Sequence, residues 1–514
     1  MGTMMYSLVF VGIGVTLVII ICLVRFFLLR KPLKYADPNL VQTDLSDSSV
    51  SPNGVPSDPL DDPAFHRFRM ALAMPTVTPE DKARTNPWLK RFQEFLVEEY
   101  PAFGKVAQAN VVDDFAIWFK WPGKNEEKKP VLFIAHYDVV PVNEKAWTHD
   151  PFEAVLEEGY LYARGALDTK FTLVALMEAV EALAARGFQP DRDVYLAFGG
   201  DEERNGTRGA QVLANHFAEE GIRFSWLLDE GSVVADGSLK AAKKPLALVA
   251  LEEKGYVNLV LTVKQAPGHS SRPPGVQAGA VLGKALSAIG KRPLRPRLLP
   301  VMKRFFQGIV PLVDRPTGFI LANLWLFWPL LHRVLGRNAT LAALFRTTMA
   351  ITIVKGGNTE NVLPDQVQAV INCRILPGEH AHDVLEQVKK RIGDKRVAVD
   401  YHPDFLVDDP VSLFPGNPEI RDVKDPRDFP GWVPVKGAIE RHFPGCPVLP
   451  FLNTALTDSR HYRSITDAIL RFAPMKLSPR EIDRIHGDDD RISLENYYTG
   501  IAFYISLLEN ISDS

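Results

Sequence analysis

Acidic and imidazole side chains recur along this chain in one particular order, and that order limits the possible folds more than any other feature. Four groups end or follow a short apolar run that predicts a buried strand, and a fifth comes near the C-terminus. They are His136-Tyr137-Asp138, Asp168, Asp201-Glu202-Glu203, Asp229 and His486. Groups this far apart can meet only if one sheet brings the strand ends together. The order therefore predicts a single site whose oxygen and nitrogen ligands suit a pair of divalent metal ions.

Length and composition narrow the class of protein. A chain of 514 residues is too long for one compact core, so two or more domains are expected. The formal net charge of -3 gives no electrostatic argument for a nucleic-acid partner. The cysteines are Cys22, Cys373 and Cys446, and no CxxC motif occurs. Any metal is therefore expected to be bound by oxygen and nitrogen atoms rather than by thiolates.

The N-terminal segment differs from the rest of the chain. Ser7 to Val24 is an uncharged, mostly apolar run that reaches the lower length limit for a membrane-spanning helix. We interpret it as a retained single-pass anchor rather than a cleavable signal peptide, because no basic segment precedes it and no A-x-A-like site follows it. One short basic cluster after the run does not decide orientation, so the side of the membrane stays open. Residues 1–34 are the expected anchor and flank, and residues 35–60, rich in Asp, Ser and Pro, the expected linker.

Strand and helix patterns alternate after the linker. Residues 131–140, 194–198 and 224–228 predict strands, and residues 171–186 predict a helix that stops at Gly187. This alternation predicts a parallel-sheet α/β domain with functional loops at the carboxyl ends of its strands. From about Val249 the pattern changes to half-exposed strands and an amphipathic helix. Because His486 comes only after this change, we expect an α/β domain made of residues 61–248 and 409–514, with an α+β domain, residues 249–408, inserted into it.

Residues 290–348 are unusual within the expected insert. They combine basic segments with the apolar stretch from Phe319 to Leu335, which contains Pro329. One interpretation is a buried hairpin of helices in the insert. Another is an interfacial element, because basic residues beside Trp325 and Trp328 suit a membrane surface or a lipid-like ligand. A contact between two copies of the chain is a third, and a second membrane span is least favoured because of the internal proline and polar residues.

The chemistry of each group supports a shared site. His136 and Asp138 are two residues apart in an extended segment and therefore share a face, so Asp138 can orient an imidazole that binds metal. Asp168 could cap the following helix, or bridge two ions with its two oxygens. Glu202 and Glu203 are adjacent and cannot face the same way, so one can bind metal while the other faces the water that the metals activate. Each group alone has an ordinary structural explanation, but their joint order favours the site.

The order HxD, D, EE, D, H, together with GHSSRPP at 268–274, resembles the M20 family of metallopeptidases. The likeness is greatest to the branch of carboxypeptidase S and the N-acyl-amino-acid hydrolases. It runs from about residue 60 to the C-terminus and is weaker over 290–348. It implies a di-zinc exopeptidase-type α/β domain with an inserted α+β lid of the dimerisation type, and hence a possible homodimer through the lid.

The resemblance also implies roles for the site residues. Two zinc ions per subunit are expected: His136 and Asp229 hold one, Glu203 and His486 hold the other, and Asp168 bridges them. Glu202 is then the general base, and Asp138 supports His136. A cis peptide bond is implied between Asp168 and Thr169, although relatives often have a second aspartate where this chain has Thr169.

Substrate-binding residues are implied mainly on the lid. The histidine matching His269 helps to stabilise the oxyanion in relatives, often from a partner subunit. Asn361 and Arg374 match the substrate-binding Asn and Arg of the family, and Arg460 in TDSRH is a further candidate. An arginine fork suits a free carboxylate. For these residues a structural turn or ordinary hydrogen bonding at strand ends is the alternative.

These expectations combine into a membrane-anchored, zinc-dependent hydrolase that cleaves an amide next to a free carboxylate, as a carboxypeptidase or an N-acyl-amino-acid hydrolase. The expected substrates are small peptides or N-acyl amino acids. The alternatives are an aminopeptidase of M28 type and a catalytically inactive, membrane-tethered binding protein. This ligand set accepts several divalent ions, so zinc is not the only possible metal. The sequence leaves open the acyl or peptide group that is cleaved.

Overall fold

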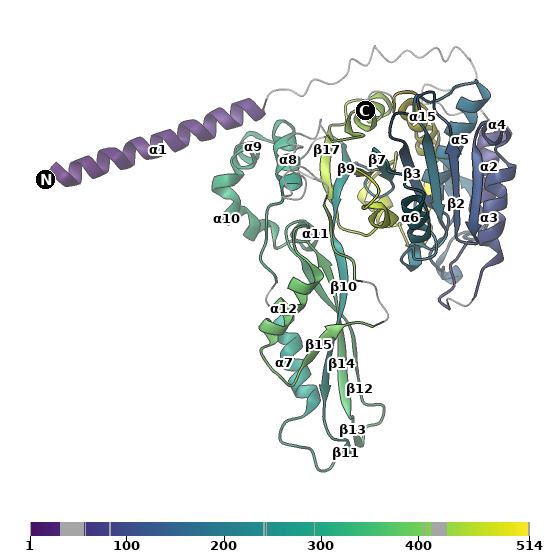
Figure 1. Ribbon diagram of the computed structural model, residues 1–514. Helices are drawn as coiled ribbons and strands as arrows, with labels where there is room; N and C mark the ends of the chain where they lie inside the picture. The colour runs from purple at the N-terminus through teal and green to yellow at the C-terminus, as the bar shows by residue number, and fades with distance from the viewer. Residues whose placement is uncertain are drawn as a thin grey trace.

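The computed structural model describes residues 2–30, 56, 58–81, 84–239, 242, 244–291, 293–403, 407–412 and 429–511, with residues 2–15 described by their backbone alone. A large and a small domain lie side by side, and a long N-terminal helix, α1 (Gly2–Leu29), extends away from them (Figure 1). Most of the predicted linker, residues 35–60, lies outside the described part of the chain.

An 11-stranded sheet forms the centre of the large domain. Its main path runs β1 (Gln108–Asp113), β2 (Ala116–Trp121), β6 (Val194–Gly199), β3 (Val131–His136), β7 (Trp226–Asp229), β18 (Ile469–Arg471), β9 (Leu246–Glu253), β8 (Val234–Ala235) and β19 (Lys476–Leu477), while β16 (Val411–Ser412) and β17 (Val448–Asn453) also pair with β9. Strands β3, β6, β7 and β18 are parallel neighbours. The strands predicted from residues 131–140, 194–198 and 224–228 are thus adjacent at the centre of the sheet, and the mixed α/β fold is confirmed.

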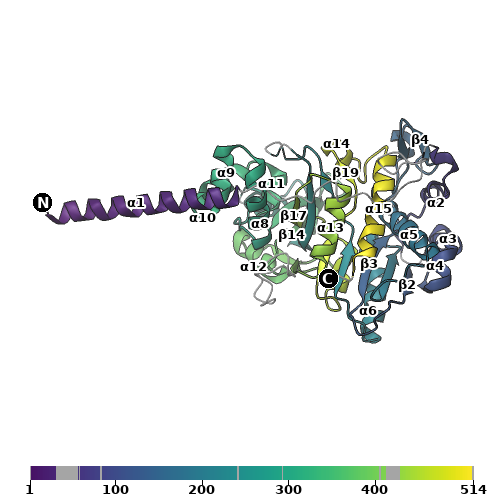
Figure 2. The same cartoon turned by 90° about the horizontal axis from the view of Figure 1, so that it is seen from above.

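Helices cover both faces of this sheet, as Figure 2 shows from above. One face carries α2 (Pro63–Leu72), α3 (Pro87–Glu98), α4 (Pro101–Val106), α5 (Lys170–Ala185), α13 (Trp432–His442) and α15 (Leu494–Glu509), and the other carries α6 (Ala210–Glu219). Successive residues of β3 point to opposite faces, so Phe133 packs in the first core and Ile134 in the second. Helix α5 ends at Ala185, and Gly187 has the left-handed φ of 72° that allows the chain to turn there.

The small domain has a core of its own. Its antiparallel sheet has the order β12 (Thr348–Gly356), β14 (Gln366–Ile375), β10 (Gly255–Lys264) and β15 (Ala398–Tyr401), and α7 (Ala278–Gly290) and α12 (Ala381–Ile392) pack on it. At its far tip, β11 (Gly268–His269) pairs with β13 (Val362–Leu363). Strand β9 belongs to the large sheet and β10 to the small one, so only Lys254 separates the two sheets at this crossing.

Residues 290–348 fold into helices, but these helices pack on the large domain rather than in the insert where we expected them. They are α8 (Pro300–Ile309), α9 (Arg315–Ala322), α10 (Leu324–Leu335) and α11 (Ala339–Ala343). The apolar side of α8 meets strand β17, where the rings of Phe305 and Phe451 are 5.4 Å apart. The buried residues of this segment join the core of the large domain. We call α8–α11 the helical platform.

Among the residues with described side chains, no single helix combines the length and apolar character of a membrane span. Helices α9 and α10 meet those criteria together, but they are bent by 113° at their junction. The predicted span from Ser7 to Val24 falls in α1 and extends into residues 2–15, which lie outside the described side chains.

Candidate metal centre

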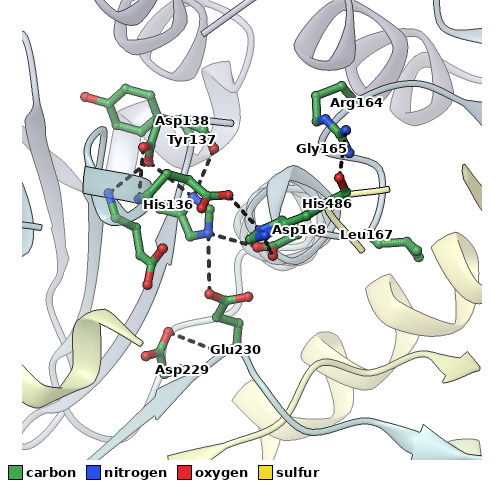
Figure 3. Close-up of polar contacts among 12 residues, drawn as sticks. His136, Tyr137, Asp138, Arg164, Gly165, Leu167, Asp168, Asp229, Glu230 and His486 are labelled. Carbon is green, nitrogen blue, oxygen red and sulfur yellow. Dashed lines mark hydrogen bonds and ion pairs between the residues drawn. The ribbon is translucent and has the colours of Figure 1, made fainter. Parts of the chain in front are cut away.

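Asp168 lies between two histidines that are far apart in the sequence. Its Oδ1 is 3.0 Å from Nε2 of His136, and its Oδ2 is 2.9 Å from Nε2 of His486 (Figure 3). His136 ends the buried strand β3, and Asp168 lies just before α5. One carboxylate that faces two imidazoles with different oxygens has the arrangement needed to bridge two cations.

The loop that carries Asp168 is shaped for this contact rather than for helix capping. The residue that caps α5 is Thr169, and its side chain makes no capping hydrogen bond. The peptide bond between Asp168 and Thr169 is cis, as the resemblance implies. The Asp168 carboxylate makes its contacts with the two histidines instead of with the start of α5.

A short antiparallel sheet brings His486 to this loop. Strand β20 (Arg491–Ser493) pairs with β5 (Tyr160–Tyr162), which in turn pairs with β4 (Val155–Glu157). Buried Asp490 accepts hydrogen bonds from the backbone N–H groups of Gly165 at 2.9 Å and Leu167 at 3.1 Å. Arg164 donates in the opposite direction, from Nη2 to the carbonyl oxygens of His486 at 3.3 Å and Gly487 at 2.8 Å. Asp490 and Arg164 thus hold the two ligand loops together, and sequence analysis missed both.

Two groups of ligand-type atoms share Asp168. His136, Asp168 and Glu230 form one, and Asp168, Glu203 and His486 form the other; within each group the possible ligand atoms all lie within 4.8 Å of one another. Nε2 of His486 is 3.0 Å from Oε1 of Glu203. A third group joins His136 to Glu202 and Glu203. The two groups that share Asp168 have the arrangement expected of two neighbouring ion sites.

Glu230, rather than the predicted ligand Asp229, lies beside His136. Oε1 of Glu230 is 3.4 Å from Nε2 of His136. Asp229 is the last residue of β7, and its carboxylate accepts hydrogen bonds from the backbone N–H groups of Glu230 at 2.8 Å and Ser459 at 3.1 Å. Adjacent side chains at the end of a strand face opposite ways. The argument that separated Glu202 from Glu203 could have identified Glu230 as an alternative ligand.

Asp138 holds His136 and the two glutamates in position. It is fully buried, with Oδ1 3.2 Å from Nδ1 of His136. Its two oxygens also accept hydrogen bonds from the backbone N–H groups of Glu202 at 3.0 Å and Glu203 at 3.2 Å. The same carboxylate therefore orients an imidazole and fixes the turn η4 (Glu202–Arg204) that carries the two glutamates.

The charged side chains of the centre would be stabilised by bound cations. Burial, and then the charge of Asp168, raise the pKa of Glu230 to about 8. Burial also raises the pKa of Glu202 and Glu203 above the ordinary range. Contact with Asp168 and then Glu203 raises the pKa of His486 to about 10. The buried carboxylates outnumber the imidazoles, and their oxygen and nitrogen atoms are the donors that divalent ions accept, so the residues present fit a pair of such ions.

The predicted substrate-binding residues do not all lie together. Arg460 is buried near the glutamate turn and donates from Nη2 to the carbonyl oxygen of Asn205 at 2.8 Å. Arg374 lies on β14, with its guanidinium carbon 4.7 Å from the ring centre of Tyr256. His269 is exposed in β11 at the tip of the small domain, where the backbone N–H of Ser270 donates to the carbonyl oxygen of Asn361 at 3.0 Å. Figure 1 shows this tip far from β3 and β7, so the structure does not bring His269 and Asn361 to the metal centre.

Comparison with known proteins adds to this geometry. The family model for peptidase family M20/M25/M40 matches residues 132–510. A probable carboxypeptidase S-like 2 of Dictyostelium discoideum is 32% identical over 97% of this chain and 92% of its own length. The N-fatty-acyl-amino acid synthase/hydrolase PM20D1 of Xenopus tropicalis is 34% identical over 86% of this chain and 84% of its own length.

Solved structures share the fold. The M20 family metallo-carboxypeptidase Sso-CP2 of Sulfolobus solfataricus has a TM-score of 0.63 at 18% identity, with 88% of this chain and 100% of that one covered. The dinuclear metal-binding peptidase YXEP of Bacillus subtilis, also of the M20 family, has a TM-score of 0.53 at 13% identity, with 87% and 96% covered.

Proposed function

This chain belongs to peptidase family M20/M25/M40 and is an enzyme of the peptidase or amidohydrolase type; from that premise we propose that it hydrolyses the amide bond next to a free carboxylate. The observation that carries the proposal is the contact of Asp168 with both His136 and His486. A free carboxylate is common to the substrates suggested by the names of both groups of relatives, which are carboxypeptidases and N-fatty-acyl-amino acid hydrolases.

The centre would hold two zinc ions. His136 and one carboxylate of the pair Asp229 and Glu230 would bind the first, Glu203 and His486 the second, and Asp168 both. Ions bound there would polarise the scissile carbonyl and lower the pKa of a bound water. The residues around them would keep the ligands in position, because Asp138, Arg164 and Asp490 fix the loops from which the ligands come.

Glu202 would act as the general base that transfers a proton from the attacking water to the leaving amine. Its backbone is held by Asp138, and its carboxylate lies in the same group as His136 and Glu203. A carboxylate in this position can accept a proton from the attacking water and pass it to the nitrogen of the leaving amine. Burial raises the pKa of the Glu202 carboxyl well above its usual range.

A guanidinium would bind the free carboxylate of the substrate. Both Nη atoms of Arg460 already donate to backbone carbonyl groups, at 2.7 Å to Thr457 and 2.8 Å to Asn205. Arg374 is only partly buried, and its guanidinium stacks on Tyr256, so we propose Arg374 as the carboxylate-binding residue. His269 and Asn361 would reach a metal centre only through movement of the small domain or from a second copy of the chain, and we propose the second copy.

Two alternative functions are less well supported. The match to family M20 disfavours an aminopeptidase of M28 type, and the similarity to enzymes of this family disfavours a catalytically inactive binding protein. We further propose that the apolar N-terminal helix anchors the enzyme to a membrane, on the strength of the uncharged run from Ser7 to Val24.

The assay that tests this function compares Z-Gly-Leu, N-oleoyl-Phe and Leu-p-nitroanilide. We expect the enzyme to cleave one of the two carboxylate substrates, with activity lost on chelation, restored by zinc and abolished in Glu202→Gln. Glu220→Gln, at an exposed glutamate after α6, is the matched control and should retain activity. Cleavage of Leu-p-nitroanilide alone would contradict recognition of a free carboxylate. Which carboxylate substrate is cut decides between peptide and lipid amide.

A further inference from the structure

The described end of helix α1 is built into the helical platform. Asn323, fully buried between α9 and α10, donates from Nδ2 to the carbonyl oxygen of Cys22 at 3.0 Å and to that of Phe319 at 2.9 Å. Nε of Arg25 donates to the carbonyl oxygen of Ala322 at 3.3 Å. The rings of Phe26 and Phe319 are 5.9 Å apart. These contacts set the direction in which α1 leaves the body.

The other sides of this part of α1 are apolar and exposed. Cys22 and Phe26 are buried against the platform, whereas eight large apolar side chains are between 41% and 66% exposed. They are Leu17, Ile19, Ile20, Ile21, Leu23, Val24, Phe27 and Leu28. A helix that is apolar on all sides is stable inside a protein core or a membrane, not in water. Because these side chains are exposed in the part of the chain that the structure describes, their composition indicates a lipid environment.

A second apolar surface lies on α10. Trp325, Leu326, Leu330 and Val334 are between 42% and 63% exposed, and their spacing places them along one face of the helix. Arg333 and Arg337 are exposed beside them. We call this set the α10 stripe. An apolar stripe that contains tryptophan and is flanked by arginine suits the boundary between lipid headgroups and acyl chains.

The α10 stripe is presented by a rigid support. On the inner side of α10, the ring of Trp328 is 5.1 Å from that of Phe345, which stacks on Phe306 at 5.7 Å. Phe306 belongs to α8, which packs on strand β17 of the large sheet. The side of α10 that faces solvent is therefore fixed relative to the catalytic domain. Figures 1 and 2 both show α9 and α10 on the side of the body from which α1 extends.

We propose that α1 and the α10 stripe engage one lipid bilayer, with α1 inside it and α10 lying along its surface. The stripe begins just after Asn323, which bonds to the backbone of α1 at Cys22, and this attachment to the apolar α1 favours a bilayer over a separate protein partner. The flanking arginines favour a surface that contains anionic headgroups. This inference goes beyond the proposed hydrolysis and does not depend on it. It would place the catalytic body directly against the lipid, with the platform as the contact.

The test measures the depth of α10 in a membrane. Full-length protein carrying Leu330→Cys is labelled with an environment-sensitive fluorophore and reconstituted into vesicles of phosphatidylcholine and phosphatidylserine. The native cysteines are buried, so labelling should be selective. Val433→Cys, at a residue that is 50% exposed on α13, is the matched control. Brominated lipids should quench the label at 330 at least threefold more strongly than the label at 433.

Three results would overturn the proposal. Equal, weak quenching at both positions would place α10 in water. Disulfide cross-linking between two copies of the unlabelled Leu330→Cys protein under oxidising conditions, together with no quenching of the labelled protein by lipid, would identify the stripe as a contact between chains. As a second variant, Trp325→Glu combined with Leu330→Glu should abolish the quenching of a label at Val334→Cys, while thermal unfolding shows that the body remains folded. Retained quenching in that variant would also contradict the proposal.

Discussion

The backbone N–H of Glu202 donates to Oδ1 of Asp138 at 3.0 Å, and the same oxygen lies 3.2 Å from Nδ1 of His136. The proposed base and a proposed metal ligand therefore depend on one buried carboxylate. A disturbance of Asp138 would reach both of them, although Asp138 itself belongs to none of the candidate ligand groups.

Replacement of Asp138 tests this shared support. We expect Asp138→Asn to reduce kcat by roughly 10- to 100-fold, the usual effect of losing a residue that orients a metal ligand. An amide has one acceptor oxygen where the carboxylate has two, so the contacts to His136 and to the glutamate turn cannot all persist. Steady-state kinetics with measurement of bound zinc would check it, with exposed Asp365→Asn as the control. Unchanged kcat would contradict the proposed role.

Counting bound metal ions can decide whether Asp229 or Glu230 is the third carboxylate ligand. We expect the double variant Asp229→Asn, Glu230→Gln to bind no more than one zinc ion per chain, because the ion beside His136 would keep only His136 and the shared Asp168 as ligands. The single variants then assign the ligand: the contact of Glu230 with His136 predicts the loss in Glu230→Gln. Two ions retained by the double variant would contradict the assignment of this part of the centre.

Asp490 should matter for stability as well as for activity. Its oxygens accept from two backbone N–H groups, and Asp490→Asn leaves one of these donors poorly satisfied. Loss of a buried hydrogen bond of this kind costs about 1–3 kcal/mol. Urea unfolding should show that loss, and weaker zinc binding should accompany it because the loops of Asp168 and His486 separate. Asp488→Asn, at an exposed neighbour, provides the comparison.

A histidine away from the centre predicts a pH dependence of stability. Burial, and then the nearby charge of Arg441, lower the pKa of His442 to about 4, and its Nε2 lies 2.7 Å from the Ser506 hydroxyl. Between pH 4 and about 6.5 the unfolded chain binds a proton at this position that the folded chain does not. The free energy of unfolding should therefore fall as the pH falls through this range, by at most roughly 3 kcal/mol from this group. His442→Gln should reduce the dependence in unfolding experiments at pH 4.5 and 7.

His269 provides a test of the proposed pairing of two chains. His269→Ala and Glu202→Gln should each be nearly inactive alone. If one chain supplies His269 to the centre of another, mixing the two variants should restore up to about a quarter of the wild-type activity, since a mixed dimer has one intact centre. No recovery on mixing would indicate that His269 reaches the centre of its own chain or does not take part.

The ends of the central strands could be predicted because their signals are local. The apolar runs before His136 and Asp229 predict buried parallel strands, and adjacency in the sheet then follows from the fold class. The alternation of side chains at a strand end was applied to Glu202 and Glu203 but not to Asp229 and Glu230. Asp490 was missed because its role is visible only once β20 pairs with β5.

The position of the helical platform could not have been predicted from local patterns. An apolar face on α8 indicates that the helix is buried, but not which domain buries it. The partner, Phe451 on β17, is more than a hundred residues away in the sequence. The same holds for His269: its motif identifies the family, whereas its distance from the centre depends on how the small domain and any second chain are arranged.

The insertion of the small domain has a consequence for synthesis of the enzyme. Four of the five ligand groups precede the small domain in the chain, whereas His486 and its support Asp490 follow it. A nascent or prematurely released chain would therefore lack half of the bridge made by Asp168. Hydrolytic activity would be withheld until the residues up to Asp490 have been made and strand β20 has paired with β5.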